Sequence, residues 1–143
     1  MFEEAINEFV ELCKEKFGDD LISVVLFGSV ARGTAKKGSD IDLLIIVRGI
    51  PKRILDREDA VSEEIMKIIR KYHVRVMPVL LGLDDLSDRV INPLIYGILT
   101  GYEVLHDPHG FWDSYLQKIK PRILEKRPVY IEYGQRWQIA DLI

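Results

Sequence analysis

The sequence predicts one α/β (α+β) domain, in which helices pack on a mixed sheet of about four strands. Short apolar runs rich in Val, Leu and Ile alternate with amphipathic stretches along the chain. Residues 43–47 are continuously apolar, which is typical of a strand buried on both faces. The length of 143 residues and the apolar fraction of 48% suit a single packed core.

The first half of the chain is expected to alternate helices and strands. Apolar residues at helical spacing predict a helix over residues 2–17, and β-branched residues predict strands over 21–27 and 40–47. A long helix is expected over residues 52–72. Its acidic residues are interpreted as a solvated face: Asp56, Glu58, Asp59, Glu63 and Glu64.

A third strand is expected over residues 74–81. It contains Pro78, which has no N–H to donate, so the strand should be at an edge, bulged or locally unpaired there. Beyond Gly82, Asp84 and Asp85 are expected to cap a short helix over residues 86–89.

The next two elements are a helix over residues 94–100 and a short strand over 102–105. Pro93 suits the first turn of that helix, and Gly101 suits its end. The segment 106–109 contains two histidines and an acid. A plain turn set by Asp107-Pro108 is the simpler interpretation, and a zinc or second metal site is the alternative.

We divide the chain into a core, residues 1–107, and a helical C-terminal extension, residues 108–143, packed on the core or on a partner. An amphipathic stripe supports a helix in the extension: Phe111, Trp112, Tyr115, Leu116, Ile119 and Ile123. After Pro128 the chain carries Tyr130, Tyr133 and Trp137 among apolar residues. This C-terminal aromatic segment could form a surface for a partner or for a homo-oligomer.

Composition excludes several classes of protein. The net charge of −3 gives no electrostatic case for nucleic acid, so an RNA contact through the basic and aromatic residues of the extension ranks low. The sequence contains no apolar run long enough to span a membrane and no signal peptide. The single cysteine, Cys13, rules out an internal disulfide, which fits a cytoplasmic protein.

The stretch over residues 24–47 carries the chemistry. Asp40 and Asp42 begin its second apolar run, and side chains two apart in a strand point to the same side, roughly 6.5–7 Å apart. Two carboxylates at the mouth of a buried strand are unfavourable unless a positive group satisfies them. A hard divalent cation such as Mg²⁺ satisfies both, with phosphate oxygens and waters as its other ligands.

The first apolar run of the same stretch ends in Gly28-Ser29. Gly28 permits a sharp turn and the close approach of a ligand, and Ser29 could cap a short helix through Val30 to Arg32. The N–H groups at a helix start bind phosphate, and Arg32 could add a charged contact. Together these residues predict the apparatus of metal-assisted nucleotidyl transfer.

The segment GSVARGTAKKGSDIDLLIIV resembles the signature of the minimal nucleotidyltransferases of the DNA polymerase beta superfamily. The match implies the nucleotidyltransferase fold, Mg²⁺ (or Mn²⁺) bound by Asp40 and Asp42, and nucleotide phosphates seated by Gly28 and Ser29. Gly33 and Ser39 also match the pattern, and Ser39 is assigned with Arg32 to the nucleotide site. A plain strand-turn-strand with a solvated acidic edge is the alternative.

One part of the family pattern is absent. By the resemblance, active members carry a third carboxylate on the third strand, which helps to deprotonate the attacking hydroxyl or to bind a second metal. The strand over residues 74–81 contains no acid. Asp84 or Asp85 could reach inward from the following loop. Without such a group, nucleotide could bind while chemistry is slow, since a base contributes typically about 10²–10⁴-fold.

The expected function is Mg-dependent transfer of a nucleotidyl group, AMP from ATP by the resemblance, to an acceptor hydroxyl. Small members of the family act beside a HEPN-domain protein in toxin–antitoxin pairs, in which the antitoxin adenylylates a tyrosine of the toxin. The resemblance therefore implies a HEPN partner. The alternative is a catalytically degenerate nucleotide-binding or protein-interaction module that lacks the third carboxylate.

Overall fold

The computed structural model describes residues 2–57 and 59–143. Four strands form one sheet in the order β3-β2-β1-β4, in which β2 and β3 are parallel and the other neighbours are antiparallel. The strands are β1 (Leu21–Phe27), β2 (Ile41–Val47), β3 (Val76–Leu81) and β4 (Glu103–His106). The helices are α1 (Glu3–Phe17), α2 (Gly28–Arg32), α3 (Ser62–Tyr72), α4 (Pro93–Leu99) and α5 (Phe111–Lys126). The predicted mixed sheet of about four strands is confirmed.

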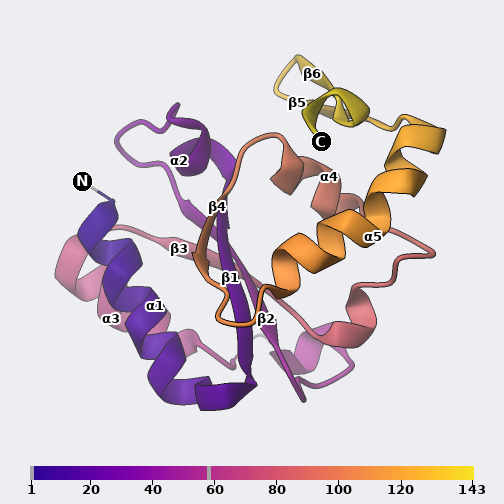
Figure 1. Ribbon diagram of the computed structural model, residues 1–143. Helices are drawn as coiled ribbons and strands as arrows, with labels where there is room; N and C mark the ends of the chain where they lie inside the picture. Colours follow the sequence, from indigo (N-terminus) through magenta and orange to yellow (C-terminus); the bar gives the residue numbers. More distant parts are fainter. Residues whose placement is uncertain (1, 58) are drawn as a thin grey trace.

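Helices cover the sheet on both faces (Figure 1). On one face, α1 and α3 pack on Leu43 and Ile45 of β2. On the other face, α4 and α5 pack on Leu44 and Ile46. Successive residues of a strand point to opposite faces, which is why the continuous apolar run of β2 feeds two separate clusters.

The segment expected to be one long helix over residues 52–72 is divided in the structure. A 3₁₀ turn, Ile54–Arg57, is followed by α3, which begins only at Ser62. Ile54 is exposed, whereas helical spacing of the apolar residues over 52–72 would have it buried. The acidic residues are not all solvated either, since Glu64 is buried and its Oε1 lies 3.0 Å from Lys16 Nζ of α1. Glu58 lies outside the described residues.

Of the three alternatives given for the third strand, the structure shows the edge position, because β3 is the last strand on its side of the sheet. The expected helix over residues 86–89 is wrong. The structure instead has a 3₁₀ turn at Leu83–Asp85, just before those residues. The Gly82 N–H donates to Asp85 Oδ2 at 2.8 Å. Asn92 caps α4 by accepting from the Leu94 N–H, as the Asn-Pro start predicts.

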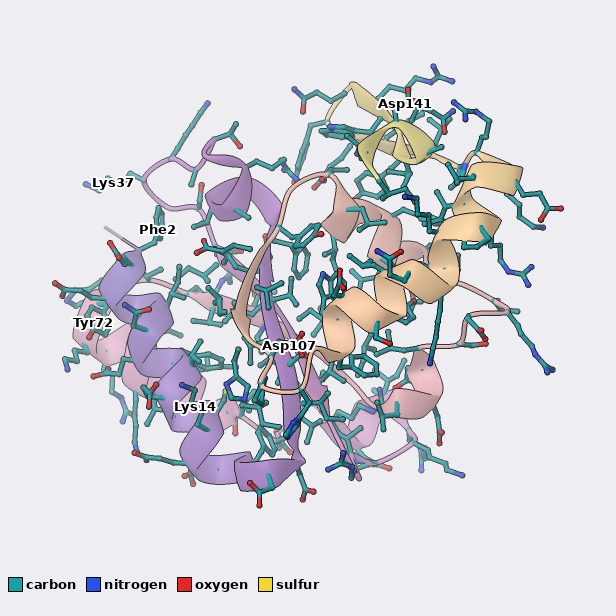
Figure 2. The ribbon with its side chains drawn as sticks, viewed as in Figure 1. Phe2, Lys14, Lys37, Tyr72, Asp107 and Asp141 are labelled. Carbon is teal, nitrogen blue, oxygen red and sulfur yellow. The ribbon has the colours of Figure 1, made fainter. Side chains whose placement is uncertain are left out.

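Asp107 caps the start of α5 from three residues before its N-cap residue, Gly110, a role that its place in a predicted turn did not reveal (Figure 2). Its Oδ1 accepts hydrogen bonds from Ser23 Oγ and from the Phe111 N–H, and its Oδ2 accepts from the Trp112 N–H. Trp112 is buried in the cluster that also contains Val25 of β1. The cap and the buried stripe together fix α5 on the sheet.

The chain beyond α5 is not helical throughout. It forms a two-stranded antiparallel hairpin, β5 (Val129–Glu132) and β6 (Gln135–Gln138), and ends in a 3₁₀ turn, Ile139–Leu142. The hairpin lies beside α4 at the C-terminal end of α5 (Figure 1). Tyr130 and Trp137 pack against the cluster under α4 and α5. The division at residue 107 stays a prediction.

Candidate functional site

Asp42 lies directly against the turn at Gly28. In the antiparallel register, Phe27 of β1 pairs with Asp42 of β2, which brings the next residue, Gly28, beside the Asp42 carboxylate. Gly28 has φ +75°, and a β-carbon at this position would overlap Asp42 Oδ2. A side chain at position 28 would therefore occupy the space that the carboxylate fills, so only glycine provides this close approach.

The environment of Asp42 opposes its negative charge. Burial, then the charge of Asp40 and then that of Glu132 raise the pKa of Asp42 to about 6, and Arg32 acts in the opposite direction. A carboxylate crowded by two other acids is the chemical setting in which a divalent cation gains most. The surroundings of Asp42 are therefore those expected of the metal ligand that the sequence predicts. The assignment of Asp42 as a metal ligand stays a prediction.

Asp40 stands just before β2 and is held by Arg75, which precedes β3. Arg75 Nε lies 3.1 Å from Asp40 Oδ1, and Nη2 lies 3.0 Å from Oδ2, so the pair is bidentate. Asp40 and Asp42 are close enough for the charge of one to act on the other. A cation bound by both carboxylates would have to share Asp40 with Arg75 or displace it.

The short helix α2 follows the turn, but Ser29 does not cap it. The helix begins at Gly28, so Ser29 lies in its first turn, and the N-cap residue is Phe27, which has no side-chain oxygen. The Ser29 carbonyl accepts from the Thr34 N–H at 2.9 Å, which closes the chain after the helix. Ser39 shapes the next turn, since its Oγ accepts from the Lys36 N–H at 2.8 Å.

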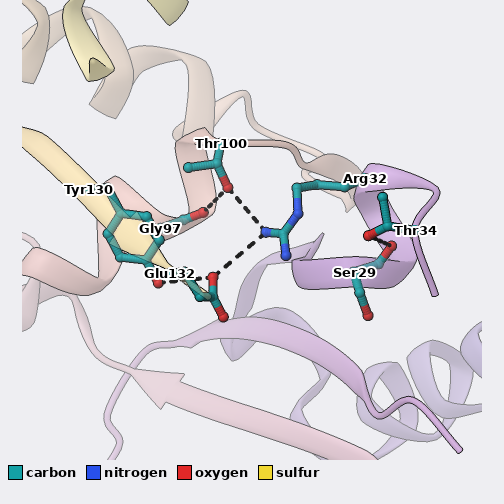
Figure 3. Close-up of polar contacts among 7 residues, drawn as sticks. All are labelled: Ser29, Arg32, Thr34, Gly97, Thr100, Tyr130 and Glu132. Atoms are coloured by element: carbon teal, nitrogen blue, oxygen red, sulfur yellow. Dashed lines mark hydrogen bonds and ion pairs between the residues drawn. The ribbon is translucent and has the colours of Figure 1, made fainter. Parts of the chain in front are cut away.

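Arg32 points toward the C-terminal hairpin (Figure 3). Its Nη1 donates to Thr100 Oγ1 at 3.2 Å and lies 3.9 Å from Glu132 Oε2. Its guanidinium carbon lies 5.6 Å from the centre of the Trp137 ring, a cation–π contact. The predicted contact between Arg32 and nucleotide phosphates stays a prediction, because in this arrangement the guanidinium contacts α4, β5 and β6.

Comparison with known proteins agrees with this architecture. The family model described as "Nucleotidyltransferase domain" matches residues 6–99. A Methanocaldococcus jannaschii protein, provisionally named a protein adenylyltransferase, is 48% identical over 143 residues, which cover 100% of this chain and 97% of that protein. The chain belongs to the nucleotidyltransferase domain family. A second M. jannaschii protein with the same provisional name is 35% identical over 91 residues, 63% of this chain and 82% of its own length.

Solved structures share the fold of this nucleotidyltransferase. A toxin–antitoxin structure with AMP-PNP has a TM-score of 0.56 at 22% identity and covers 85% of this chain and 90% of its own. A complex of a tri-AMPylated Shewanella oneidensis HEPN toxin with its MNT antitoxin has a TM-score of 0.54 at 19% identity, covering 89% and 92%. Spectinomycin adenyltransferase of Enterococcus faecialis, with ATP and spectinomycin, has a TM-score of 0.60 at 14% identity, covering 87% and 66%.

The nucleotidyltransferase carries no acid on β3 beside Asp42. The parallel register sets Met77 opposite Asp42, and Met77 is 44% exposed. Asp85 does not supply the missing carboxylate from the loop, because its Oδ2 lies 2.9 Å from Nη1 of the buried Arg57. Asp84 and Asp85 line a hollow of about 610 Å³ beyond the C-terminal ends of β2 and β3, whereas Asp42 is near their N-terminal ends.

Glu132 is the residue near this site that sequence reasoning missed. It lies about 90 residues beyond the aspartates, on β5, yet its charge acts on Asp42 and its Oε2 contacts Arg32. Tyr130 Oη also donates to Glu132 Oε2, at 3.2 Å. The sequence offered only a weak signal, an acid between Ile131 and Tyr133 in the segment interpreted as a partner surface.

The alternative metal site around His106 and His109 gains no support. Within residues 2–57 and 59–143, no group of three or more His, Cys, Asp or Glu side chains is arranged to hold a metal ion. In the same residues, no helix is both long enough and apolar enough to cross a membrane. Asp107, the acid of this segment, is engaged in capping α5.

Proposed function

We propose that this nucleotidyltransferase transfers AMP from ATP to a hydroxyl group of a protein acceptor, with Asp40 and Asp42 as the metal-binding pair. The observation that carries the proposal is the close approach of Gly28 to the Asp42 carboxylate. It sets the start of α2 beside the carboxylate, where a polyphosphate and its cation could be bound together.

The residues present fit Mg²⁺. The two carboxylates are hard oxygen donors, and the negative charges around Asp42 favour a divalent cation. When bound, Mg²⁺ would offset the charge of the triphosphate and of the leaving group. Gly28 and Ser29 would seat the phosphates, and Ser39 would hold the turn that leads into Asp40. In the reaction, the acceptor oxygen forms a bond to the α-phosphorus while the bond to the β-phosphate oxygen breaks and pyrophosphate leaves.

A protein acceptor is the class of substrate that the comparisons favour. The full-length M. jannaschii relative is provisionally named a protein adenylyltransferase. The toxin–antitoxin structures support a HEPN-domain partner, whose tyrosine hydroxyl is the proposed acceptor.

Val129, Ile131 and Tyr133 alternate along β5 and into the turn, and all three are exposed. This face of the hairpin is the surface we propose for the partner or for a second copy of the chain. The cytoplasm is the proposed compartment, since the single cysteine cannot form an internal disulfide.

Label transfer tests the proposal directly. The full chain is incubated with ATP labelled at the α-phosphate, Mg²⁺ or Mn²⁺, and a candidate HEPN-domain protein. Label on a tyrosine of that protein, lost in Asp42→Asn and kept in Glu125→Gln, supports the proposal; Glu125 is an exposed acid of α5. The missing acid on β3 favours the alternative, a catalytically degenerate nucleotide-binding module. If the chain binds ATP–Mg²⁺ but transfers no label under conditions where a control relative is active, that alternative is established.

A further inference from the structure

The hairpin and Asp42 lie on one face of the sheet. In β2, Leu44 and Ile46 face the layer of α4 and α5, and strand alternation puts Asp42 on that same face. Tyr130 and Trp137 of the hairpin pack against the same cluster as Leu44 and Ile46. The hairpin therefore lies on the side of the sheet toward which Asp42 points.

Helix α2 connects Asp42 to Glu132. Gly28 and Arg32 are the first and last residues of this short helix. The Asp42 carboxylate lies against Gly28, and the Arg32 guanidinium reaches Glu132. Asp42 and Glu132 therefore contact opposite ends of α2, and the charge of Glu132 acts on Asp42.

Glu132 is held by its neighbours but not enclosed. Tyr130 Oη and Arg32 Nη1 both contact Oε2 (Figure 3). Within the part of the chain that the structure describes, Oε1 makes no hydrogen bond, and the side chain remains 33% exposed. The Tyr130 side chain that contacts Glu132 is itself held in place, because its ring packs on Gly97, where a β-carbon would come within 2.9 Å of the ring.

We propose that Glu132 is the base that takes the proton from the acceptor hydroxyl, in place of the acid that β3 lacks. This inference rests on the proposed function. As the acceptor oxygen attacks the α-phosphorus, its proton passes to Glu132 Oε1. The bond to the β-phosphate oxygen breaks, and pyrophosphate leaves with the electron pair. Arg32 and Tyr130 hold the other oxygen and so orient the carboxylate as positioning residues.

The experiment compares Glu132→Gln with the full-length wild type and with Glu125→Gln. Glutamine keeps an oxygen that can accept from Tyr130 but cannot take a proton. We expect Glu132→Gln to lower the transfer rate by about 10²–10⁴-fold, the range for loss of a general base, with KM for ATP within about threefold of wild type. Glu132→Asp, with its shorter carboxylate, should recover part of the rate.

Two further readouts separate a base from a structural residue. The Glu132→Gln rate should rise steadily between about pH 7 and 9, because hydroxide replaces the lost base, whereas Glu125→Gln should follow the wild-type profile. The ATP–Mg²⁺-induced rise in melting temperature should be equal in all three proteins. These results together would support the role of Glu132.

The outcomes distinguish this inference from the proposed function. Active wild type with an equally active Glu132→Gln would overturn the inference and leave the proposed function intact. An unchanged pH profile, or a loss matched by lost ATP binding, would show that Glu132 has a structural role and would also overturn it. If the wild-type protein transfers no label to any hydroxyl acceptor, both the inference about Glu132 and the proposed function are overturned.

Discussion

Arg75 holds the Asp40 carboxylate with two parallel hydrogen bonds, at 3.1 and 3.0 Å. The register explains the pair, because Ile41 is aligned with Val76, which sets Asp40 beside Arg75 at the start of two parallel strands. The hydrogen bonds to Asp40, and then the charge of Asp40, raise the pKa of Arg75, so the guanidinium stays positive. A cation that binds Asp40 therefore meets a competitor already in contact with the carboxylate.

Removing the Arg75 side chain should strengthen the binding of Mg²⁺ at Asp40. We expect Arg75→Gln to lower the Mg²⁺ concentration for half-maximal transfer by several-fold, because Asp40 then loses a bound positive charge. Arg75 is exposed to solvent, so its replacement should change the stability of the fold little. The measurement is the transfer rate against Mg²⁺ concentration. Arg70→Gln, an exposed arginine of α3, is the control, and an equal response in both variants would contradict the argument.

Gly28 and Gly33 provide a matched pair of glycines. Both have positive φ, +75° and +76°, but a β-carbon would meet Asp42 only at Gly28, and at Gly33 it would have nothing within 4 Å. Both alanine variants should lose roughly 1–2 kcal/mol of stability from the left-handed backbone. Gly28→Ala alone should also displace the Asp42 carboxylate and abolish the rise in melting temperature with ATP–Mg²⁺. Equal ATP binding by the two variants would show that this close approach is not part of the nucleotide site.

Asp42 should destabilise the metal-free fold at neutral pH. Its pKa is raised from 3.8 to about 6, so the folded chain binds more protons than the unfolded chain between these values. Stability therefore falls as pH rises from about 4 to 6, and the full cost is present above that window. A shift of this size corresponds to about 3 kcal/mol, and exposure of the side chain reduces this to about 1–2 kcal/mol.

Asp42→Asn should accordingly stabilise the metal-free chain at pH 7.5 and lose that advantage near pH 3, below both pKa values, where the wild-type carboxyl is mostly protonated in both states. Urea unfolding at the two pH values measures the difference. Asp84→Asn, which changes an exposed carboxyl beyond β3, is the control. A stabilisation that does not vary with pH would point to packing rather than to the charge of Asp42.

Arg57 should matter for stability and not for chemistry. Its side chain is 7% exposed, lies 2.9 Å from Asp85 and donates to the carbonyls of Pro51, Lys52 and Leu80. Arg57→Met should cost about 3 kcal/mol, since it leaves a carboxylate and three carbonyls without this partner. Urea unfolding is the measurement, with the exposed Arg53→Met as control at under about 0.5 kcal/mol. At a temperature where both variants are folded, transfer should equal wild type; a lower rate would mean that this end of the sheet contributes to the site.

The elements that sequence reasoning predicted well depend on neighbouring residues. The strands β1 and β2, the turn at Gly28 and the edge position of β3 follow from apolar runs, a glycine and a proline that act within a few residues of themselves. The division of the expected helix at residues 52–72 was missed because helical periodicity continues past the point where the chain turns. Arg57 stabilises that turn through carbonyls and Asp85, a contact across 28 positions that no local pattern reveals.

The sequence by itself determined the sheet, the adjacent aspartates and the turn that meets them, because each depends on steric and hydrophobic preferences of a few consecutive residues. Only the tertiary structure decided that Arg32 turns toward the C-terminal hairpin and that Glu132 joins the site while Asp85 is held at the far end. The physical reason is distance along the chain. Arg32 and Glu132 meet because α5 packs on the sheet and the hairpin that follows it packs on α4. That placement depends on the whole buried cluster rather than on any short segment.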